Sequence, residues 1–537
     1  MPIDWIGVTA FLIASLVATT AQAEQPLSAI DWLSQSVVAP PQGGKSTPSP
    51  DLPATATRGP VPEDVSVSVI GGTSANATGL LPPQVTGLPP ALWGLGKTSD
   101  IVAAIGRERL QTLPSLRGLL LTILLAESDP PADAGPGNGV LIARVDKLLD
   151  LGALDQARAL IDAAAVVNDP ELFRRSFDVD LLTGNEDTGC KTMVASPQLA
   201  PTFPARIFCL ARSGDWNAAA LTLRTGQALG YVTAEENALL SRFLDPDLYE
   251  GEPPLPVPER VTPLAWRMFE AIGEPLPTNT LPLAFAHAEL RPAAGWKAQI
   301  EAAERLARAG ALPANVLLGL YTERKPAASG GVWDRVATFR AFDAAMAAGD
   351  AGAIARALPA VWDQMTGAEL EVPFAELYGQ PLQTVTLDGE AAGIAFDVGL
   401  LSPAYTDIAA TPAATAATTP ATTPATTPAT TPTGATGRAA FLLGLAKGDL
   451  SGTTAPDTLG RAITPAFTGA DLTRAQTALL ADNRLGEAIL GAIEAIETGL
   501  QGDLDGVTEG LTLLRRVGLD GVARRTALEL MLLERRG

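Results

Sequence analysis

The stretch Leu151-Gly152-Ala153-Leu154-Asp155-Gln156-Ala157 joins two runs of helical hydrophobic spacing, at 140–150 and 154–167. Glycine suits the left-handed backbone conformation that commonly ends a helix, so we expect the first run to stop at Gly152. The small Ala157, five positions later, lets a second helix approach the first one closely. The stretch therefore predicts a hairpin of two short helices, and this unit decides the expected fold class.

The same join recurs at three other places, each with Gly or Asn, a polar turn and a small residue five positions later: Gly214–Ala219, Asn483–Ala488 and Gly518–Ala523. The pattern resembles the central turn of tetratricopeptide-type repeats, without their steady period of about 34 residues. This resemblance implies stacked helical hairpins. We therefore predict an all-α fold, a degenerate helical-hairpin (TPR-like) α-solenoid, with an irregular helical domain as the alternative.

Helical spacing fills most of the chain from residue 98 onward. We expect a helical-repeat domain over 98–408 and a C-terminal helical domain over 438–537. Helices in the first are predicted at 100–112, 115–127, 140–150, 154–167, 170–183, 204–212, 215–229, 233–244, 281–290, 294–309, 331–348 and 350–366. Helices in the second are predicted at 438–446, 471–481, 484–499, 503–517 and 520–536.

Two low-complexity tracts divide the chain. Residues 39–63 are rich in proline and predict a disordered linker, and residues 409–437, of Ala, Thr and Pro, predict a second one. Residues 64–97 are expected to be irregular, with one short strand where apolar residues alternate over 65–70. The predicted molecule is thus a helical body with two tethers.

The second tract repeats the unit Ala-Thr-Thr-Pro from Ala417 to Pro432. It resembles the repeats of antifreeze glycopeptides, and also an uncharacterised family of secreted bacterial helical proteins sometimes labelled antifreeze glycopeptide polyprotein. The resemblance implies that ice or another surface meets glycosylated threonines, here Thr418, Thr419, Thr422, Thr423, Thr426, Thr427, Thr430 and Thr431. A polyproline II helix has three residues per turn, so a four-residue unit rotates successive threonines by about 120° and presents no flat face. This departure favours a spacer.

The N-terminus predicts export. Residues 6–17 form an apolar run of signal-peptide length, and Ala21-Gln22-Ala23 supplies a small-residue cleavage site. The first five residues contain Asp4 and no basic residue, which departs from an ordinary signal peptide. We expect a signal peptide over 1–23, a periplasmic or secreted mature chain, and no integral membrane span in it, because no later apolar run is long enough.

An amphipathic segment follows at 24–38. Ile30, Leu33 and Val37 share a helical face, and Trp32 lies beside it. So short a helix is not stable alone in water. It is therefore predicted to pack on the body of the chain or to dock into a groove of a partner protein.

Cys190 and Cys209 are the only two cysteines of the chain. An even count in an exported protein predicts one disulfide between them. Two small buried apolar side chains are the alternative interpretation.

Composition argues against several classes of function. The net charge of −21 opposes nucleic-acid binding, which needs a basic surface. The chain has one histidine, His287, which cannot build a multi-histidine metal site and is expected to be a packed or surface residue. Residues 91–98 approach a phosphate-binding loop but lack its first glycine and the preceding strand, so they predict a turn into a helix capped by Ser99.

The acidic residues do not indicate a specific catalytic or metal site either. Glu127-Ser128 resembles the Glu-Ser of secreted lytic transglycosylases, which would make Glu127 a general acid. The rest of that family's motif is absent, and Asp129-Pro130 breaks the helix instead. The acidic loop at 245–252 has no calcium-loop spacing. We therefore expect no metal and no cofactor.

These features predict a non-enzymatic exported helical scaffold or adaptor that binds an unknown protein partner in the cell envelope. Stacked helical pairs create extended surfaces suited to proteins and peptides. The alternatives are ice or surface interaction through the Thr-rich tract and, less favoured, an envelope hydrolase.

Overall fold

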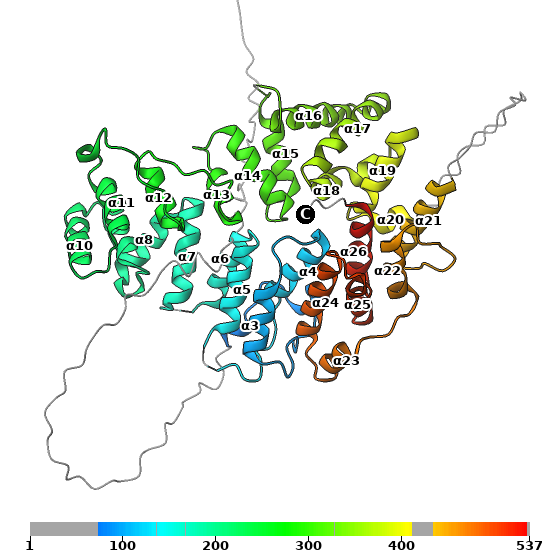
Figure 1. Ribbon diagram of the computed structural model, residues 1–537, viewed down its shortest axis with the longest axis horizontal. Helices are drawn as coiled ribbons and strands as arrows, with labels where there is room; N and C mark the ends of the chain where they lie inside the picture. The colour runs from blue at the N-terminus through cyan, green and yellow to red at the C-terminus, as the bar shows by residue number, and fades with distance from the viewer. Residues whose placement is uncertain (1–73, 136, 167, 327, 411–432, 534–537) are drawn as a thin grey trace, which may run out of the picture.

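The computed structural model describes residues 74–135, 137–166, 168–326, 328–410 and 433–533. These ranges are all-helical, as predicted, with 25 α-helices and four short 3-10 helices (Figure 1). They contain no strand, and their one isolated β-bridge pairs Leu81 with Ala126. The predicted signal peptide, docking segment (Ile30, Trp32, Leu33 and Val37), linker 39–63 and strand 65–70 all lie outside the described residues.

The described chain begins with the 3-10 helix η1 (Ala75–Ala77) and then continues through a succession of helices. The first helices are α2 (Pro83–Thr86), α3 (Thr98–Arg107), α4 (Pro114–Leu125), α5 (Gly139–Asp150) and α6 (Leu154–Ala164). A second group extends to one side of the molecule (Figure 1). It contains α7 (Pro170–Thr183), α8 (Glu186–Ala195), η2 (Pro197–Leu199), α9 (Phe203–Arg212), α10 (Trp216–Ala228), α11 (Ala234–Leu244), η3 (Pro246–Tyr249) and α12 (Pro263–Ala271).

The chain then returns and completes the main body. Its middle part contains η4 (Leu283–Phe285), α13 (Ala286–Glu289), α14 (Trp296–Arg308), α15 (Ala314–Glu323), α16 (Val332–Ala348), α17 (Ala351–Gly367), α18 (Glu371–Leu382), α19 (Gly389–Leu401) and α20 (Tyr405–Ala410). Its last part contains α21 (Thr433–Lys447), α22 (Thr458–Thr468), α23 (Arg474–Ala481), α24 (Leu485–Gly499), α25 (Leu504–Arg516) and α26 (Asp520–Leu532). Helix α20 ends at Ala410 and α21 begins at Thr433, so both helices extend into the predicted linker 409–437. The rest of that linker, residues 411–432, lies outside the described residues.

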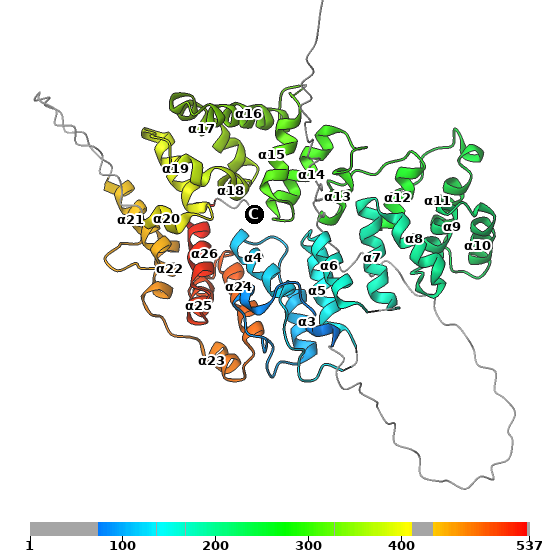
Figure 2. The same cartoon turned by 180° about the vertical axis from the view of Figure 1, so that it is seen from behind.

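The last helices close the body against the first ones. Helix α24 packs on α3 and α4, and α26 packs on α4 and α19, as both views show (Figures 1 and 2). The N-terminus of α4 makes the tightest polar contact at this closure. The Ser115 backbone N–H donates to both carboxylate oxygens of Glu529 on α26, at 3.0 and 2.9 Å, and the Ser115 hydroxyl donates at 2.7 Å.

The backbone of the predicted joins explains why the hairpins form. Gly152, Gly214, Asn483 and Gly518 all have positive φ angles, from 55° to 89°. This confirms the left-handed helix ends that the sequence predicted. Such angles cost a residue with a side chain more than they cost glycine. The predicted boundaries are close for most helices, but helix α3 begins at Thr98, so the expected cap at Ser99 is wrong.

Several helices were not predicted from the sequence. They are α2, α8, α12, α15, α18, α19, α20 and α22. Helix α19 is apolar on nearly all sides, and α18 begins with Glu371-Val372-Pro373 and contains Pro381. Periodicity is weak in such segments because their neighbours bury more than one face.

Apolar side chains form two separate cores within the described residues. The larger core runs from Leu88 to Leu533 and so includes residues near both ends of the described part of the chain. The smaller core, of 17 buried residues, belongs to α7–α12. We call the region 170–275 the lobe and the remainder the body. In the part that the structure describes, no helix is both long and apolar enough to cross a bilayer.

Candidate functional site

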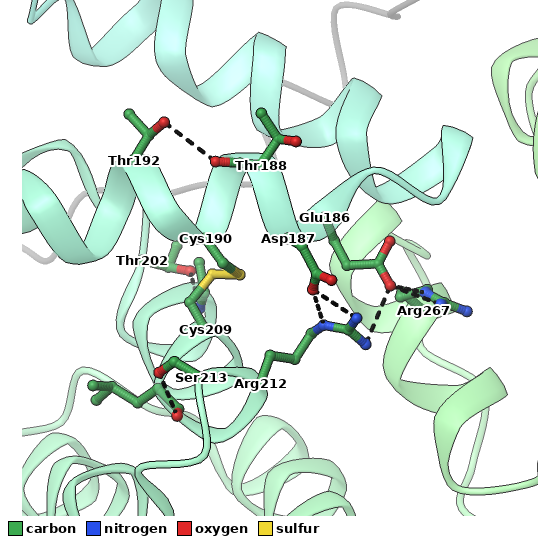
Figure 3. The surroundings of a disulfide bond; sticks show 12 residues. Glu186, Asp187, Thr188, Cys190, Thr192, Thr202, Cys209, Arg212, Ser213 and Arg267 are labelled. Atoms are coloured by element: carbon green, nitrogen blue, oxygen red, sulfur yellow. Dashed lines mark hydrogen bonds and ion pairs between the residues drawn. A yellow bond between two sulfur atoms is a disulfide. The ribbon is translucent and has the colours of Figure 1, made fainter.

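The lobe is held by a disulfide. Cys190 on α8 is joined to Cys209 on α9, with their Cα atoms 4.9 Å apart (Figure 3). Both residues are buried in the small core. The cross-link therefore connects two successive hairpins of the lobe through its interior.

An ion-pair network lies beside the disulfide (Figure 3). Glu186 is 1% exposed, and its Oε1 atom lies 2.7 Å from Nη2 of Arg267 and 3.2 Å from Nη1 of Arg212. Arg212 also pairs with Asp187 at 2.7 Å. Burial opposes the charge of Arg267, but the hydrogen bonds and negative charges of Glu186 and Glu270 together outweigh it, so the pKa of Arg267 is raised. The network fastens α8 to α9 and α12.

The outer side of the lobe exposes apolar side chains. Of the twelve large hydrophobic residues that are exposed in the described ranges, seven fall between residues 194 and 257. Leu221 and Leu229, of helix α10 and its C-terminal end, are 67% and 61% exposed. We call the surface formed by Leu221, Thr225, Ala228 and Leu229 the α10 face. Figure 1 places α10 at the far edge of the part of the molecule that the structure describes.

A second feature is a cleft in the body, where its first, middle and last helices meet. Its volume is about 490 Å³, which suits a small-molecule ligand. The cleft is bounded by α2, α4, α18, α19, α20 and α26. Its apolar lining includes Leu119, Val372, Leu401 and Val522. We call it the central cleft.

Three polar side chains give the central cleft its chemistry. Glu376 comes from α18 and Arg525 from α26, and both are exposed at its mouth. The surrounding protein raises the pKa of the Glu376 carboxyl group, and Arg525 partly offsets that effect. The Arg525 guanidinium lies 5.6 Å from the ring centre of Tyr405, in cation–π contact. The cleft thus offers separate negative and positive groups between apolar walls.

His287 has a structural place. It is buried, and its Nε2 atom lies 3.1 Å from the carbonyl oxygen of Gly152 in the first hairpin join. Burial lowers its pKa to about 4, so the ring is neutral at ordinary pH. This confirms a packed histidine, and the partner at Gly152 shows that the ring fastens α13 to the turn between α5 and α6.

The loop-like residues 91–98 also serve packing. Leu92 accepts a hydrogen bond from Gly486 N–H, and Leu95 N–H donates to Asp482, so the segment pairs with the turn between α23 and α24. Gly94 lies so close to Asn483 that a Cβ atom would stand 2.1 Å from its carbonyl oxygen. Close backbone contact therefore explains this glycine without a phosphate.

The remaining acidic candidates do not gather into a site. Glu127 is exposed after the end of α4, and its backbone N–H donates to Leu81. In the described ranges, which include 245–252, no group of three or more His, Cys, Asp and Glu side chains could hold a metal ion.

Sequence reasoning missed the buried ionisable groups. Glu108, at the end of α3, is 5% exposed, and burial together with Glu497 raises its pKa to about 9. Arg144 is 1% exposed and donates to the carbonyls of Leu124, Thr78 and Ala126. Neither residue stands in a sequence motif, because the partners come from distant or irregular segments.

Comparison of the chain with protein-family models, curated proteins and solved structures finds no match in any of the three. The α10 face and the central cleft are therefore the two surfaces from which we infer a function.

Proposed function

We propose that the protein is an exported, non-enzymatic helical scaffold or adaptor of the cell envelope, and that it binds a protein partner through the α10 face. The proposal includes the arrangement of the hairpins as a degenerate, TPR-like solenoid whose lobe is its open end. The signal-like N-terminus and the disulfide support an oxidising compartment.

The α10 face is the observation that carries the proposal. Helical arrays normally end in a capping helix with a polar outer surface, because an apolar end is exposed to water. Helix α10 instead exposes Leu221 and Leu229 beside the charged Arg224. An apolar surface with a polar rim is typical of protein–protein contacts. The partner is therefore expected to present an apolar segment flanked by at least one acidic side chain.

The test is affinity purification from envelope extracts after crosslinking. The wild-type chain is compared with the double variant Leu221→Lys/Leu229→Lys and with Val316→Lys, a matched change at an exposed apolar residue of α15 in the body. A partner that is captured by the wild type and the control, and lost with the double variant, supports the proposal. Equal capture by all three chains excludes the α10 face, and no specific partner contradicts the adaptor function.

A separate measurement addresses the Thr-rich tract. Deletion of residues 411–432 is expected to leave partner capture unchanged, because the α10 face lies in another part of the chain. Thermal hysteresis that is present in the full chain and disappears with the deletion would instead support ice interaction.

A further inference from the structure

The central cleft joins three parts of the chain that are far apart in sequence. Helix α4 comes from the beginning of the described chain, α18–α20 from its middle and α26 from its end. Ligand sites commonly form where separate structural units meet, because the walls are supplied by rigid elements. The cleft is therefore held open by the same packing that closes the body.

The polar groups on the floor of the cleft already have hydrogen-bond partners within the protein. Glu529 accepts hydrogen bonds from the backbone and hydroxyl groups of Ser115, and the Ser115 and Thr526 hydroxyls lie 2.9 Å apart. A carboxylate at a helix N-terminus is stabilised by the helix dipole. Glu529 thus serves the closure of the body, and any ligand contact would fall to the groups nearer the mouth.

The groups at the mouth keep free hydrogen-bonding capacity. Within the described residues, neither the Glu376 carboxylate nor the Arg525 guanidinium forms a hydrogen bond or a direct ion pair with another side chain. Stacking on Tyr405 holds the guanidinium in place and leaves its edge N–H groups available. The carboxylate can accept from an ammonium group, and the guanidinium can donate to a carboxylate.

We propose that the central cleft binds a small zwitterion with an apolar side chain, an amino acid or a short peptide, with its carboxylate at Arg525 and its ammonium group at Glu376. Leu119, Val372 and Val522 then surround the apolar side chain. A purely anionic ligand at Arg525 would place a negative charge near the Glu376 carboxylate. A purely cationic ligand at Glu376 would place a positive charge near the Arg525 guanidinium. A ligand with both charges satisfies the two groups together.

The test uses isothermal titration calorimetry on the full mature chain with four probes. These are L-leucine, the dipeptide leucyl-leucine, N-acetyl-L-leucine, which lacks the ammonium group, and L-leucinamide, which lacks the carboxylate. We expect at least one of the two zwitterions to bind more tightly than the two singly charged probes, by about 10-fold or more. The reason is that the loss of each charged contact weakens the binding constant by about one to two factors of ten. The comparison of leucine with the dipeptide separates the two sources of the ligand.

Two variants test which residue contacts each charged group of the ligand. Arg525→Gln should weaken zwitterion binding about 10-fold or more without weakening leucinamide, and Glu376→Gln should do so without weakening N-acetyl-leucine. Both residues are exposed, so neither change disturbs the core. Arg224→Gln and Glu235→Gln, at exposed residues of the lobe, are the matched controls and should bind like the wild type.

Failure of both zwitterions to bind the wild type overturns the proposal. Equal binding of zwitterionic and singly charged probes also overturns it, as does binding that survives both variants. These outcomes leave the α10 face untouched, because its variants lie in the lobe.

Discussion

The body and the lobe are both built from short helices, but they are stabilised differently. The body closes on itself, with α24 and α26 packed against α3 and α4, so residues from both ends share one large core. The lobe has a core of 17 buried residues, and all of them come from one continuous stretch of the chain. It contains the one disulfide found among the described residues.

The difference follows from size. A small helical unit buries a smaller fraction of its surface than a large one and is correspondingly less stable. A covalent link compensates by restricting the unfolded chain. The body needs no such link in its described part, because its long-range contacts provide the stability. With the disulfide in place, the lobe remains folded although α10 exposes apolar side chains. The body buries most of its apolar surface and has a cleft where its helices meet.

The largest expected effect is in the body. Arg144→Met removes the donor from three backbone carbonyls, of Leu124, Thr78 and Ala126, and should lower the free energy of unfolding by about 3–5 kcal/mol. Urea denaturation followed by circular dichroism measures the change. Hydrogen exchange should rise in α4 and α5 and stay unchanged in the lobe. The exposed control Arg224→Met should stay within about 0.5 kcal/mol of wild type, and a similar small effect at Arg144 would contradict the interpretation.

The next effect separates the lobe from the body. Cys190→Ser/Cys209→Ser removes a cross-link between residues 19 apart, which the chain-entropy model values at about 3 kcal/mol. Limited proteolysis should cut the variant within 186–275 while the body stays intact. Simultaneous loss of protection in α3–α5 would show that the two regions unfold together.

A pH-dependent effect is expected at the closure of the body. Burial, and after it the charges of Glu497 and Glu494, raises the pKa of Glu108, while Lys147 and Arg107 lower it in part, so the net value is about 9. The folded state thus keeps a proton that the unfolded state releases above about pH 4.5, so stability falls as pH rises from there toward 9.

Glu108→Gln should remove this cost and raise the free energy of unfolding at pH 8 by about 1–3 kcal/mol, with little gain at pH 4.5. Denaturation at the two pH values is the measurement. Because other buried groups titrate in the same range, such as Asp180, whose pKa burial raises to about 6, the difference between variant and wild type is compared at each pH. A gain that is independent of pH would contradict the assignment to this carboxyl group.

The smallest effect concerns the α10 face. Leu221→Lys should change the free energy of unfolding by less than about 0.5 kcal/mol, because Leu221 is 67% exposed. Thermal denaturation checks this expectation. A loss of several kcal/mol would mean that this face supports the lobe itself, and it would weaken the proposed docking function.

Local sequence was sufficient for many helices. The joins at Gly152, Gly214, Asn483 and Gly518 predicted both the turns and their left-handed backbone, because positive φ is costly for most residues. Helix α7 begins and ends as predicted, at Pro170 and Thr183, since a proline suits the first turn of a helix. Periodicity was less useful for α18 and α19, where burial on several sides removes the polar stripe.

The sites were much harder to predict. No local pattern marks Glu376 and Arg525, which are about 150 residues apart and line one cleft only because α19 packs on both α18 and α26. Residues 91–98 do not reveal that Gly94 must lie close to Asn483, because that partner is far away in the sequence. The sequence of α10 likewise does not show that the α10 face is exposed, because exposure depends on how the other helices pack.

The sequence by itself determined the helical class, the turn positions and the pair of cysteines, because backbone preferences and hydrophobic spacing act over a few residues. The tertiary structure decided the closure of α26 on α4, the burial of Glu108 and Arg144, the division into body and lobe, and the central cleft. Each of these depends on contacts between residues far apart in the chain. Their energies come from burial and from paired charges, which no short stretch contains.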